Sequence, residues 1–373
     1  MFQTMMGRRG RGTRSEAAQR IRAIVLVTGV WTLALTTPSQ AALSPLRAGA
    51  QVANARAVTG HPLYAWGNND SGQLGDGTNL TRLTPVRVGA GTNWASVAAG
   101  QNHTVAVRTD GTLWTWGDNR YGELGDGTTT DRITPSRVGT DRDWASVTAG
   151  GFDTLAVRTD GTLWAWGIND NGELGDGTTT DRITPTRVGP DSDWATVATS
   201  GFHTVAVKTD GTLWTWGFNQ FNQLGDGTTT DRGTPGQVGT DTNWTSVAAG
   251  GLHTVATRTD GTLWAWGYNG YGQLGDGTFT DRSTPVQVGT DTHWAQLAAG
   301  YFHSTAVKTN GTLWAWGYNG QGNLGDGTTT NRFTPVEVGA GTNWVSVAAG
   351  NGHTVALGQR AHGRPRNGQD LFG

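Results

Sequence analysis

The sequence predicts an all-β protein, a β-propeller of six blades with four strands and about 50 residues in each blade. The chain of 373 residues contains 59 Gly and 18 Trp. One motif repeats every 50 residues, without insertion or deletion, from Leu63 to Leu357, and each copy holds short runs of alternating apolar residues. Fixed periods of about 20 to 50 residues are typical of solenoids, propellers and arrays. The short alternating runs favour strands and therefore a propeller.

The composition excludes several classes of protein. Only 15% of the residues are charged, which fits neither a highly charged disordered chain nor a collagen-like one. The absence of cysteine excludes a disulfide framework, a thiolate metal site and a cysteine nucleophile. Residues 43–357 carry 18 basic and 27 acidic side chains, a net charge of −9. Because phosphate recognition needs a basic surface, we expect no nucleic-acid partner.

Residues 1–41 are predicted to be a secretory signal peptide. Six Arg lie between positions 8 and 22, the apolar run extends from Ile21 to Leu35, and Ser39-Gln40-Ala41 provides a small-x-small cleavage signal. The apolar run is shorter than the roughly 20 residues of a membrane-spanning helix, although an uncleaved anchor is the alternative. We expect a product that is secreted, periplasmic or at the cell surface, with no membrane span.

Aromatic residues mark the same positions in every copy. One column contains Trp66, Trp116, Trp166, Trp216, Trp266 and Trp316, a second contains Trp94, Trp144, Trp194, Trp244, Trp294 and Trp344, and a third starts at Trp114 with Tyr64 in the first copy. Burying three such side chains contributes about 15 kcal/mol per copy. Ordering 50 residues costs on the order of 50 to 100 kcal/mol, so a copy folds only if neighbouring copies cover its faces.

The second copy shows the predicted elements. Its strands are expected at Leu113 to Trp116, Pro135 to Val138, Trp144 to Val147, and Thr154 to Val157. The intervening run Gly117 to Thr134, rich in Gly, Asn, Asp and Thr, predicts a long loop. Thr159-Asp160-Gly161-Thr162 predicts a tight hairpin into the next copy. No stretch beyond the signal segment has a 3.6-residue period, so we expect almost no helix.

The repeat resembles a known one. Leu263 begins the run Leu-Trp-Ala-Trp-Gly-Tyr-Asn-Gly-Tyr-Gly-Gln-Leu-Gly-Asp-Gly-Thr, which is followed by Thr284-Pro285 and by Ala298-Ala299-Gly300-Tyr301-Phe302-His303-Ser304. This pattern is similar to the repeat of the regulator of chromosome condensation family, and the similarity covers residues 63–357. It implies a propeller. The usual ring of that family has seven blades, so seven blades with one imperfect blade is the alternative to six.

The ends of the repeat region have separate predictions. Residues 42–62 form an N-terminal segment in which Gln51 to Val58 faintly echoes the predicted strand at Val105 to Arg108. We expect this segment to help close the ring by pairing with the last copy. Residues 358–373 are expected to be a disordered tail.

Residues present in every copy are interpreted as structural, because an asymmetric site needs residues that break the symmetry. The G-x-G-x-x-G runs that begin at Gly270 and Gly320 precede no helix, so we interpret them as loop glycines with positive φ rather than a dinucleotide site. The carboxylates of Asp126 and Asp131 are candidate calcium ligands, but their spacing is not that of an EF-hand and favours an Asx turn at Asp126 bonded to Arg132.

A histidine column is the strongest candidate for metal binding. It contains His103, His203, His253, His303 and His353, with Asp153 in the remaining copy. Imidazoles around an axis can bind a transition metal, but the favoured interpretation is that the ring nitrogens tie loop backbone beside the next strand. We therefore expect no metal and no cofactor.

The sequence contains no recognisable catalytic motif. There is no G-x-S-x-G elbow, H-E-x-x-H or P-loop, and the residues unique to one copy form no catalytic constellation: His293, Asp153, Arg142, Glu337 and Pro190. We expect the protein not to be an enzyme. The alternative is a secreted hydrolase or lyase with a site near the central channel.

Positions that vary between copies are the candidates for binding. After each Trp-Gly pair the copies differ, and aromatic residues gather in copies four to six, at Phe218, Phe221, Tyr268, Tyr271 and Tyr318, with Arg120 and Tyr121 further round. Because equivalent loops lie on one face of a propeller, we expect an arc of exposed rings that binds a protein partner or, less favoured, a glycan. The alternative is that the rings pack on neighbouring loops.

Three functions remain. The favoured one is an exported, monomeric scaffold that binds protein through this face. The resemblance also implies guanine-nucleotide exchange on Ran, as in eukaryotic family members, but export and the acidic body count against it. The third is the secreted enzyme. The family also includes a secreted bacterial inhibitor of β-lactamases, and 2 Lys beside 25 Arg is typical of a GC-rich bacterial genome.

Overall fold

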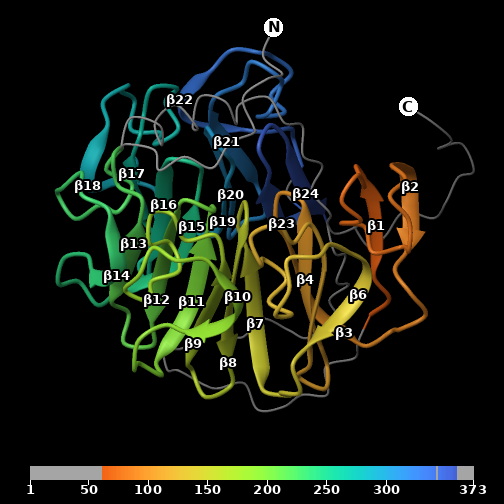
Figure 1. Ribbon diagram of the computed structural model, residues 1–373. Helices are drawn as coiled ribbons and strands as arrows, with labels where there is room; N and C mark the ends of the chain where they lie inside the picture. The colour runs from red at the N-terminus through yellow and green to blue at the C-terminus, as the bar shows by residue number, and fades with distance from the viewer. Residues whose placement is uncertain (1–60, 342, 359–373) are drawn as a thin grey trace, which may run out of the picture.

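The computed structural model describes residues 61–341 and 343–358. Every regular element in these residues is a β-strand, as the sequence predicts, and none of them belongs to a helix that could cross a membrane. The sheets follow one another around the body in chain order, and Figure 1 shows their colours running from orange through green to blue. The predicted signal peptide 1–41, nearly all of the segment 42–62, and the tail beyond Gly358 lie outside the described residues.

Five four-stranded antiparallel sheets form complete blades, and in each the strands lie side by side in chain order. Their bounds are β3 (Trp94–Ala99), β4 (His103–Arg108), β5 (Leu113–Gly117) and β6 (Arg132–Val138); β7 (Trp144–Ala149), β8 (Asp153–Arg158), β9 (Leu163–Gly167) and β10 (Arg182–Arg187); β11 (Trp194–Thr199), β12 (His203–Lys208), β13 (Leu213–Gly217) and β14 (Arg232–Gln237); β15 (Trp244–Ala249), β16 (His253–Arg258), β17 (Leu263–Gly267) and β18 (Arg282–Gln287); and β19 (Trp294–Ala299), β20 (His303–Lys308), β21 (Leu313–Gly317) and β22 (Arg332–Glu337).

Two two-stranded sheets stand at the ends of the ring. They are β1 (Tyr64–Gly67) with β2 (Arg82–Arg87), and β23 (Trp344–Ala349) with β24 (Thr354–Gly358). Counted by position in the repeat, β23 and β24 correspond to the first two strands of a blade, and β1 and β2 correspond to the last two. The 24 strands therefore amount to six blades, as predicted, with the sixth divided between the two ends of the chain.

The blade and the sequence copy are out of phase by half a unit. Each complete sheet contains two strands from one copy and two from the next. For example, β8 ends one copy, β9 begins the next, and the predicted hairpin joins them. In this hairpin the Arg158 N–H donates to the Thr162 carbonyl at 3.0 Å. Asp160 accepts the Thr162 backbone N–H at 3.0 Å and its hydroxyl at 2.7 Å. A short Asx turn thus links consecutive copies within one sheet.

The hydrophobic core lies between blades, as the energetics of a single copy require. Leu155 and Leu163 of one blade pack with Trp194 and Trp216 of the next. Trp216 is fully buried, and its Nε1 donates to the carbonyl of Glu173 in the preceding blade at 2.9 Å. Burying one indole contributes about 5 kcal/mol. Each blade is therefore held by its neighbours.

A glycine in the long loop makes room for each buried indole. Gly175 has a φ of +76°, and a Cβ atom there would lie 2.6 Å from Nε1 of Trp216. Only glycine accepts both that backbone conformation and that approach. The same fit joins Gly75 to Trp116, Gly125 to Trp166, Gly225 to Trp266, and Gly275 to Trp316.

In each complete blade a cation lies over two further tryptophans, one on the first strand and one on the third. The Arg108 guanidinium lies 4.7 Å from the ring centre of Trp94 and 3.7 Å from that of Trp114. Such contacts contribute about 0.5 to 2 kcal/mol, depending on exposure. The equivalent cations are Arg158, Lys208, Arg258 and Lys308.

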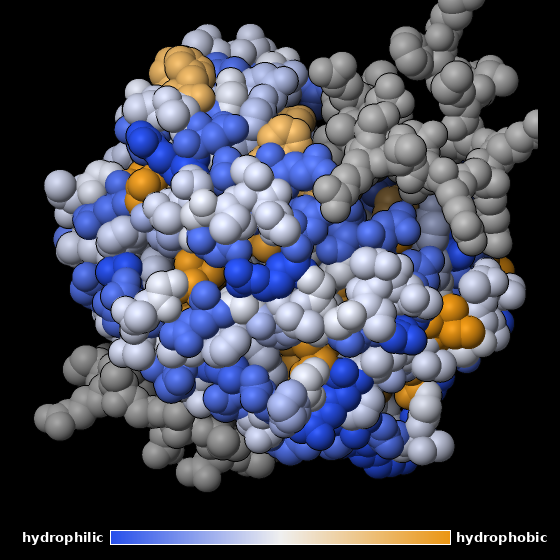
Figure 2. Space-filling model, turned by 60° about the vertical axis from the view of Figure 1, so that its left-hand side comes forward, coloured by the Kyte–Doolittle hydropathy of each residue, from blue (hydrophilic) through white to orange (hydrophobic). Residues whose placement is uncertain are grey.

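The outer surface carries only scattered hydrophobic side chains on the face that Figure 2 shows, where orange spots are separated by polar residues. Phe279 and Phe333, which are 56% and 38% exposed, pack against each other with ring centres 4.4 Å apart. Isolated exposed hydrophobic residues of this kind are normal on soluble proteins.

Replacing Gly175 with Ala should lower the free energy of unfolding by about 2 to 5 kcal/mol, because left-handed strain adds to overlap with Trp216. Gly189 is the matched control, since its φ is +62° but nothing lies within 4 Å of the added Cβ. Gly189→Ala should cost only about 1 to 2 kcal/mol. Urea unfolding followed by tryptophan fluorescence measures both, and equal losses would contradict the interlocking of loop and indole.

Candidate interaction face

Two sets of loops meet at one face of the propeller, which we call the loop face. They are the turn between the first and second strands of each blade and the long loop between the third and fourth. The Phe218 N–H donates to the Phe202 carbonyl at 2.8 Å, and the Tyr268 N–H donates to the Leu252 carbonyl at 2.9 Å. Equivalent bonds place both loop types side by side in every complete blade.

An asparagine at the start of each long loop organises it. Asn119 Nδ2 donates to the Thr128 carbonyl at 3.0 Å, and its Oδ1 accepts the Leu124 N–H at 3.0 Å. Asp126 accepts the Thr128 N–H at 2.9 Å and pairs with Arg132 at 2.6 Å, which confirms the predicted Asx turn. Burial raises the pKa of Asp126, but the hydrogen bonds from Thr128 and Arg132 outweigh it and hold the pKa below its ordinary value.

The second carboxylate considered for calcium has a different role. Asp131 accepts the backbone N–H of Asn119 at 2.9 Å, whereas Asp126 serves the turn and Arg132. In the part of the chain that the structure describes, no group of three or more His, Asp or Glu side chains is placed to hold a metal ion.

Eight aromatic side chains from three neighbouring blades form a continuous group on the loop face, which we call the aromatic cluster. Neighbouring ring centres lie 4.5 to 6.5 Å apart, mostly with tilted or edge-to-face geometry. Such pairs contribute about 0.5 to 1.5 kcal/mol each beyond the area they bury. The members are Phe202, Phe218, Phe221, Tyr268, Tyr271, Tyr301, Phe302 and Tyr318.

Glycines allow the rings to lie against backbone. Tyr301 crosses over Gly251, where a Cβ atom would lie 2.8 Å from its ring, and reaches Phe202 with ring centres 6.3 Å apart. The blade β15–β18 lies between their two blades in the chain. Tyr268 similarly lies over Gly270, where any side chain would clash with the phenol. The Tyr301 hydroxyl has no hydrogen-bond partner, and burial raises its pKa to about 12.

Five of the seven predicted binding residues belong to the aromatic cluster: Phe218, Phe221, Tyr268, Tyr271 and Tyr318. The prediction that all five rings are exposed is wrong for Phe218, which is 1% exposed because Phe202 and Phe221 cover it. The other four are half-buried, so the rings do pack on neighbouring loops while keeping part of their surface open.

The other two predicted residues stand apart from the cluster. Arg120 is exposed and pairs with Asp118 at 2.6 Å. Tyr121 packs against Phe152, with ring centres 5.4 Å apart. The structure therefore places Arg120 and Tyr121 on the loop face but with other partners.

Sequence reasoning missed Phe202, Tyr301 and Phe302 because it compared only the positions after each Trp-Gly pair. The position just before the histidine column also varies between copies. It holds Asn102, Phe152, Phe202, Leu252, Phe302 and Gly352. Comparing this second variable column would have identified the turn that completes the cluster.

Comparison with known proteins decides the family. The regulator of chromosome condensation (RCC1) repeat matches the chain six times, at residues 62–107, 110–157, 160–207, 210–257, 260–307 and 310–357. The chain belongs to the RCC1 repeat family. The resemblance seen in the sequence is thereby confirmed. No curated protein matches the chain significantly.

Solved RCC1-like propellers share its fold. Human WBSCR16 is 24% identical with a TM-score of 0.73, over 80% of this chain and 81% of that one. Prp20p from Saccharomyces cerevisiae is 23% identical with a TM-score of 0.72, over 80% and 79%. Yeast RCC1 (Prp20) bound to Kap60 is 22% identical with a TM-score of 0.72, over 87% and 84%.

In this RCC1-repeat propeller the recurrent histidine joins neighbouring blades. His203 Nε2 lies 2.9 Å from the Thr254 hydroxyl, which itself donates to the Gln223 carbonyl at 2.9 Å. Because the hydroxyl proton is used there, His203 must donate from Nε2. Burial lowers the pKa of His203 to about 3, so the imidazole is neutral. The same bond joins His103 to Thr154, His253 to Ser304, and His303 to Thr354.

This arrangement corrects the prediction for the histidine column. The prediction was that the imidazole nitrogens form hydrogen bonds with loop backbone beside the following strand. Their Nε2 partners are instead strand hydroxyls of the next blade, 51 positions further along the chain. The column is a set of bonds between blades.

Asp153 replaces histidine at one junction, together with two further changes. Its carboxylate accepts the Thr199 hydroxyl at 2.6 Å, where every other copy has alanine in place of Thr199. Ser200, a glycine in the other copies, lies 3.2 Å from His203 Nδ1. Burial raises the pKa of Asp153 to about 7, although the Thr199 hydrogen bond opposes it.

Two buried glutamates occupy a position that holds Gln or Asn in the other four copies. Glu123 accepts the Tyr121 N–H at 2.8 Å, and Glu173 accepts the Asn171 N–H at 2.8 Å. Burial raises the pKa of Glu123 to about 7 and that of Glu173 well above its ordinary value. These buried carboxyls accept hydrogen bonds from the loop backbone, and they bind protons more tightly in the folded state than in the unfolded state.

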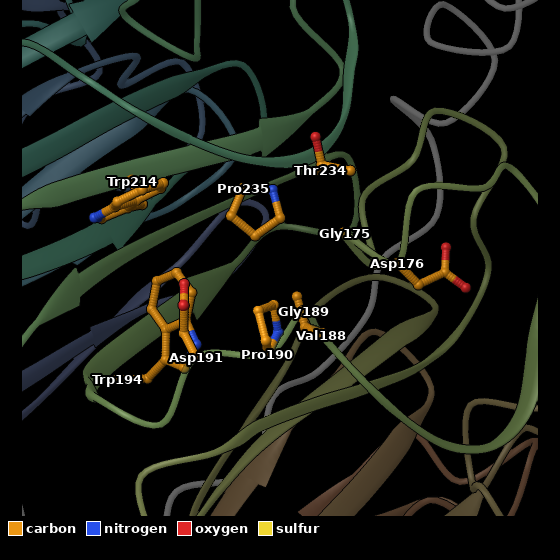
Figure 3. A pocket seen from close by; sticks show the side chains of 10 residues that line it. All are labelled: Gly175, Asp176, Val188, Gly189, Pro190, Asp191, Trp194, Trp214, Thr234 and Pro235. Atoms are coloured by element: carbon orange, nitrogen blue, oxygen red, sulfur yellow. The ribbon is translucent and has the colours of Figure 1, made fainter.

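A cavity of about 260 Å³ lies between the blades β7–β10 and β11–β14, and Figure 3 shows its walls. None of its lining residues belongs to the aromatic cluster. Its two carboxylates already have cationic partners, since Asp176 pairs with Arg182 and Asp191 pairs with Lys208 at 2.8 Å. The remaining walls are mainly apolar: Val188, Pro190, Trp194, Trp214 and Pro235.

The raised pKa of Glu123 predicts that this residue lowers the free energy of unfolding at high pH. Its folded-state pKa lies above the unfolded value, so the protonated carboxyl stabilises the fold at low pH, and this stabilisation falls as pH rises from about 4.5 to about 7. Glu123→Gln should match the wild type near pH 4 and exceed its free energy of unfolding by about 3 kcal/mol at pH 8.

The free energy of unfolding of the variant must be compared with that of the wild type at each pH. The buried neutral histidines make both proteins more stable as pH rises, which opposes the effect of Glu123. Gln223 shows that glutamine fits the same position in another copy. Urea unfolding at a series of pH values measures the difference, and the exposed Glu337→Gln serves as control. A difference that does not grow between pH 4 and 8 would refute the assignment.

Proposed function

We propose that this chain is an exported RCC1-repeat propeller that binds a protein partner through the aromatic cluster. The observation that carries the proposal is the continuity of eight rings on one face, in the copies where symmetry-equivalent loops differ. Tyrosine is enriched in the hot spots of protein interfaces, and a rigid, prepacked group of rings loses little entropy on binding.

The composition of the cluster favours a partner with an apolar anchor. None of its eight members is charged, and seven of them retain partly exposed surface. Their mutual edge-to-face packing leaves few ring faces flat to solvent, so stacking of sugar rings is less favoured than insertion of protein side chains. A protein partner therefore fits better than a glycan.

The buried polar groups support a binding role rather than a catalytic one. His203 and its equivalents are neutral and bonded between blades, and Glu123 and Glu173 support loop backbone. Each is engaged in holding the scaffold, whereas the aromatic cluster is a varying element, and most of its side chains keep part of their surface open.

Export is the second part of the proposal. The basic stretch, apolar run and Ser39-Gln40-Ala41 signal at the N-terminus support cleavage before Ala42. Sequencing the N-terminus of the mature protein tests this directly. An N-terminus at Ala42 is expected, whereas intact protein retaining residues 1–41 inside the cell would exclude export.

Fold relatives show that propellers of this kind bind proteins. Prp20p has binding properties toward Gsp1p and histones, and yeast RCC1 has been crystallised bound to Kap60. These are properties of those proteins. They support a binding face here without naming the partner, and a nucleotide-exchange assay on a Ran-type GTPase, expected to show no acceleration, tests the alternative function.

The cluster is tested by exchanging residues between copies. Tyr268→Ile with Tyr271→Asn installs the residues of the third copy, Ile168 and Asn171, in equivalent positions of the loop. With residues 42–373 as bait in the native extracellular fraction, a protein that binds the wild type should bind this variant at least tenfold more weakly. Loss of the anchor rings removes about 1.4 kcal/mol or more.

Phe279→Thr is the matched control for this experiment. It removes an exposed ring outside the cluster and installs the threonine found in most other copies. Binding should be unchanged in this variant. A partner that binds all three proteins equally would contradict the assignment of the cluster as the binding site.

A further inference from the structure

Four of the five complete blades neutralise the cation over their indoles with an aspartate 17 positions earlier in the chain. The pairs are Asp141 with Arg158 at 2.5 Å, Asp191 with Lys208 at 2.8 Å, Asp241 with Arg258 at 2.5 Å, and Asp291 with Lys308 at 2.6 Å. Each aspartate lies in the loop before the first strand of its blade. The strands therefore hold the cation, and the loop supplies its counter-charge.

The blade β3–β6 has the cation without the aspartate. Arg108 occupies the cation position, but the residue 17 positions earlier is Gly91. In the last copy both members differ, since Gly341 stands at the aspartate position and Gly358 at the cation position. Within the described strands, Arg108 is therefore the one cation of this column that has no aspartate at the paired position.

No other carboxylate takes the place of that aspartate. Among the described residues none forms an ion pair with Arg108, and Asp110, which acts on it by charge, pairs with Arg142 at 3.1 Å. Burial lowers the pKa of Arg108, and the charge of Asp110 opposes this effect only in part. A guanidinium nevertheless stays protonated at physiological pH, so Arg108 carries a partly buried and uncompensated positive charge.

The space that an aspartate would fill is present at Gly91. A Cβ atom added there would lie 4.0 Å from Nη2 of Arg108 and 3.9 Å from Nε1 of Trp94. Its nearest neighbour would be Oδ1 of Asn93 at 3.3 Å, which is the end of a flexible side chain. A carboxylate joined to such a Cβ would come within hydrogen-bond distance of the guanidinium. The space thus fits one acetate-sized group.

The guanidinium is held in place for such a contact. It lies 3.7 Å from the ring centre of Trp114 and 4.7 Å from that of Trp94. Stacking against two indoles restricts the long arginine side chain, so little further entropy is lost when a ligand binds. The planar arginine fork also matches the two oxygens of a carboxylate.

We propose that Arg108, held by Trp94 and Trp114 beside Gly91, binds the carboxylate of a small organic acid. The ligand takes the place that an aspartate fills in four other blades. The site lies away from the loop face, because β4 begins at the turn of the loop face and ends at Arg108. The inference therefore does not depend on the proposed function.

Inorganic phosphate is a poorer ligand for this site. The aspartates at the equivalent positions show that the space suits a planar carboxylate that carries one negative charge. Residues 43–357 have a net charge of −9, so the surrounding field repels a divalent anion more strongly than a monovalent one. A monocarboxylate is therefore favoured over phosphate.

Acetate is the probe for this site, and ¹H–¹⁵N NMR of the arginine side chains of the full chain measures its binding. The Nε–H signal of Arg108 is assigned by its loss in Arg108→Gln. When sodium acetate replaces sodium chloride at constant ionic strength, this signal should shift saturably with a Kd on the order of 10 mM, as one charge-assisted contact gives.

Two variants show whether the acetate lies at position 91. Gly91→Asp supplies the carboxylate from the chain itself, so acetate should bind this variant at least about tenfold more weakly. Gly341→Asp is the matched control, because it adds the same charge in the last copy, where Gly358 stands at the cation position. The acetate response of Arg108 should be unchanged in this control.

Four results would overturn the proposal. A shift that grows linearly without saturation would indicate screening only, and an undiminished response in Gly91→Asp would place the acetate elsewhere. Phosphate binding more tightly than acetate would refute the ligand class. Outside the described residues and the predicted signal peptide, Asp370 is the one acidic side chain. Clearly tighter acetate binding by Asp370→Asn would show that the chain fills the site itself.

A stability measurement tests the same geometry without a ligand. Gly91→Asp should raise the urea midpoint of the full chain, because the new carboxylate pairs with Arg108. Gly341→Asp should give no such rise, and neither glycine has a left-handed φ that would strain the variant. The rise should also be absent when Gly91→Asp is combined with Arg108→Gln. An equal rise in the control or in the double variant would show that a carboxylate at position 91 does not reach the guanidinium.

Discussion

The contact between a buried indole and the loop glycine of the preceding blade is the constraint on which the rest of the structure depends. Trp216 fills the space that Gly175 leaves open, and its Nε1 donates to the carbonyl of Glu173 in the same loop. The bond between His203 and Thr254 reinforces the next junction near the turns of the loop face. Both contacts run from one blade to the next, so a complete blade leaves some of its buried polar groups and its core uncovered without its neighbours.

This dependence separates two kinds of position within one repeat. Most residues that hold neighbouring blades together recur from copy to copy, with Asp153 and Thr199 as the exception at one junction, whereas residues at the open ends of the loops vary. The aromatic cluster has developed in that free set, across three consecutive blades, and glycines such as Gly251 and Gly270 accommodate its rings. A rigid circular scaffold can thus carry an asymmetric binding face without altering the contacts that stabilise it.

Periodicity and turn chemistry were sufficient to predict the strands, the hairpins and the propeller. The Asx turn at Asp126 was also predictable, because its partners Thr128 and Arg132 are close in sequence. Contacts with partners in other blades could not be predicted in this way. His203 forms a hydrogen bond with a hydroxyl 51 positions away, and Tyr301 packs against Phe202 across an intervening blade. Burial of Phe218 likewise depends on a ring in another turn, which no local pattern reports.

The most direct test of mutual support is the behaviour of one complete sheet in isolation. Residues 144–188 contain all four strands β7 to β10 but neither neighbouring blade. Far-ultraviolet circular dichroism during heating should show no cooperative transition for this peptide, since both faces of its sheet are left uncovered. A sharp, reversible melt of the isolated sheet would contradict the account.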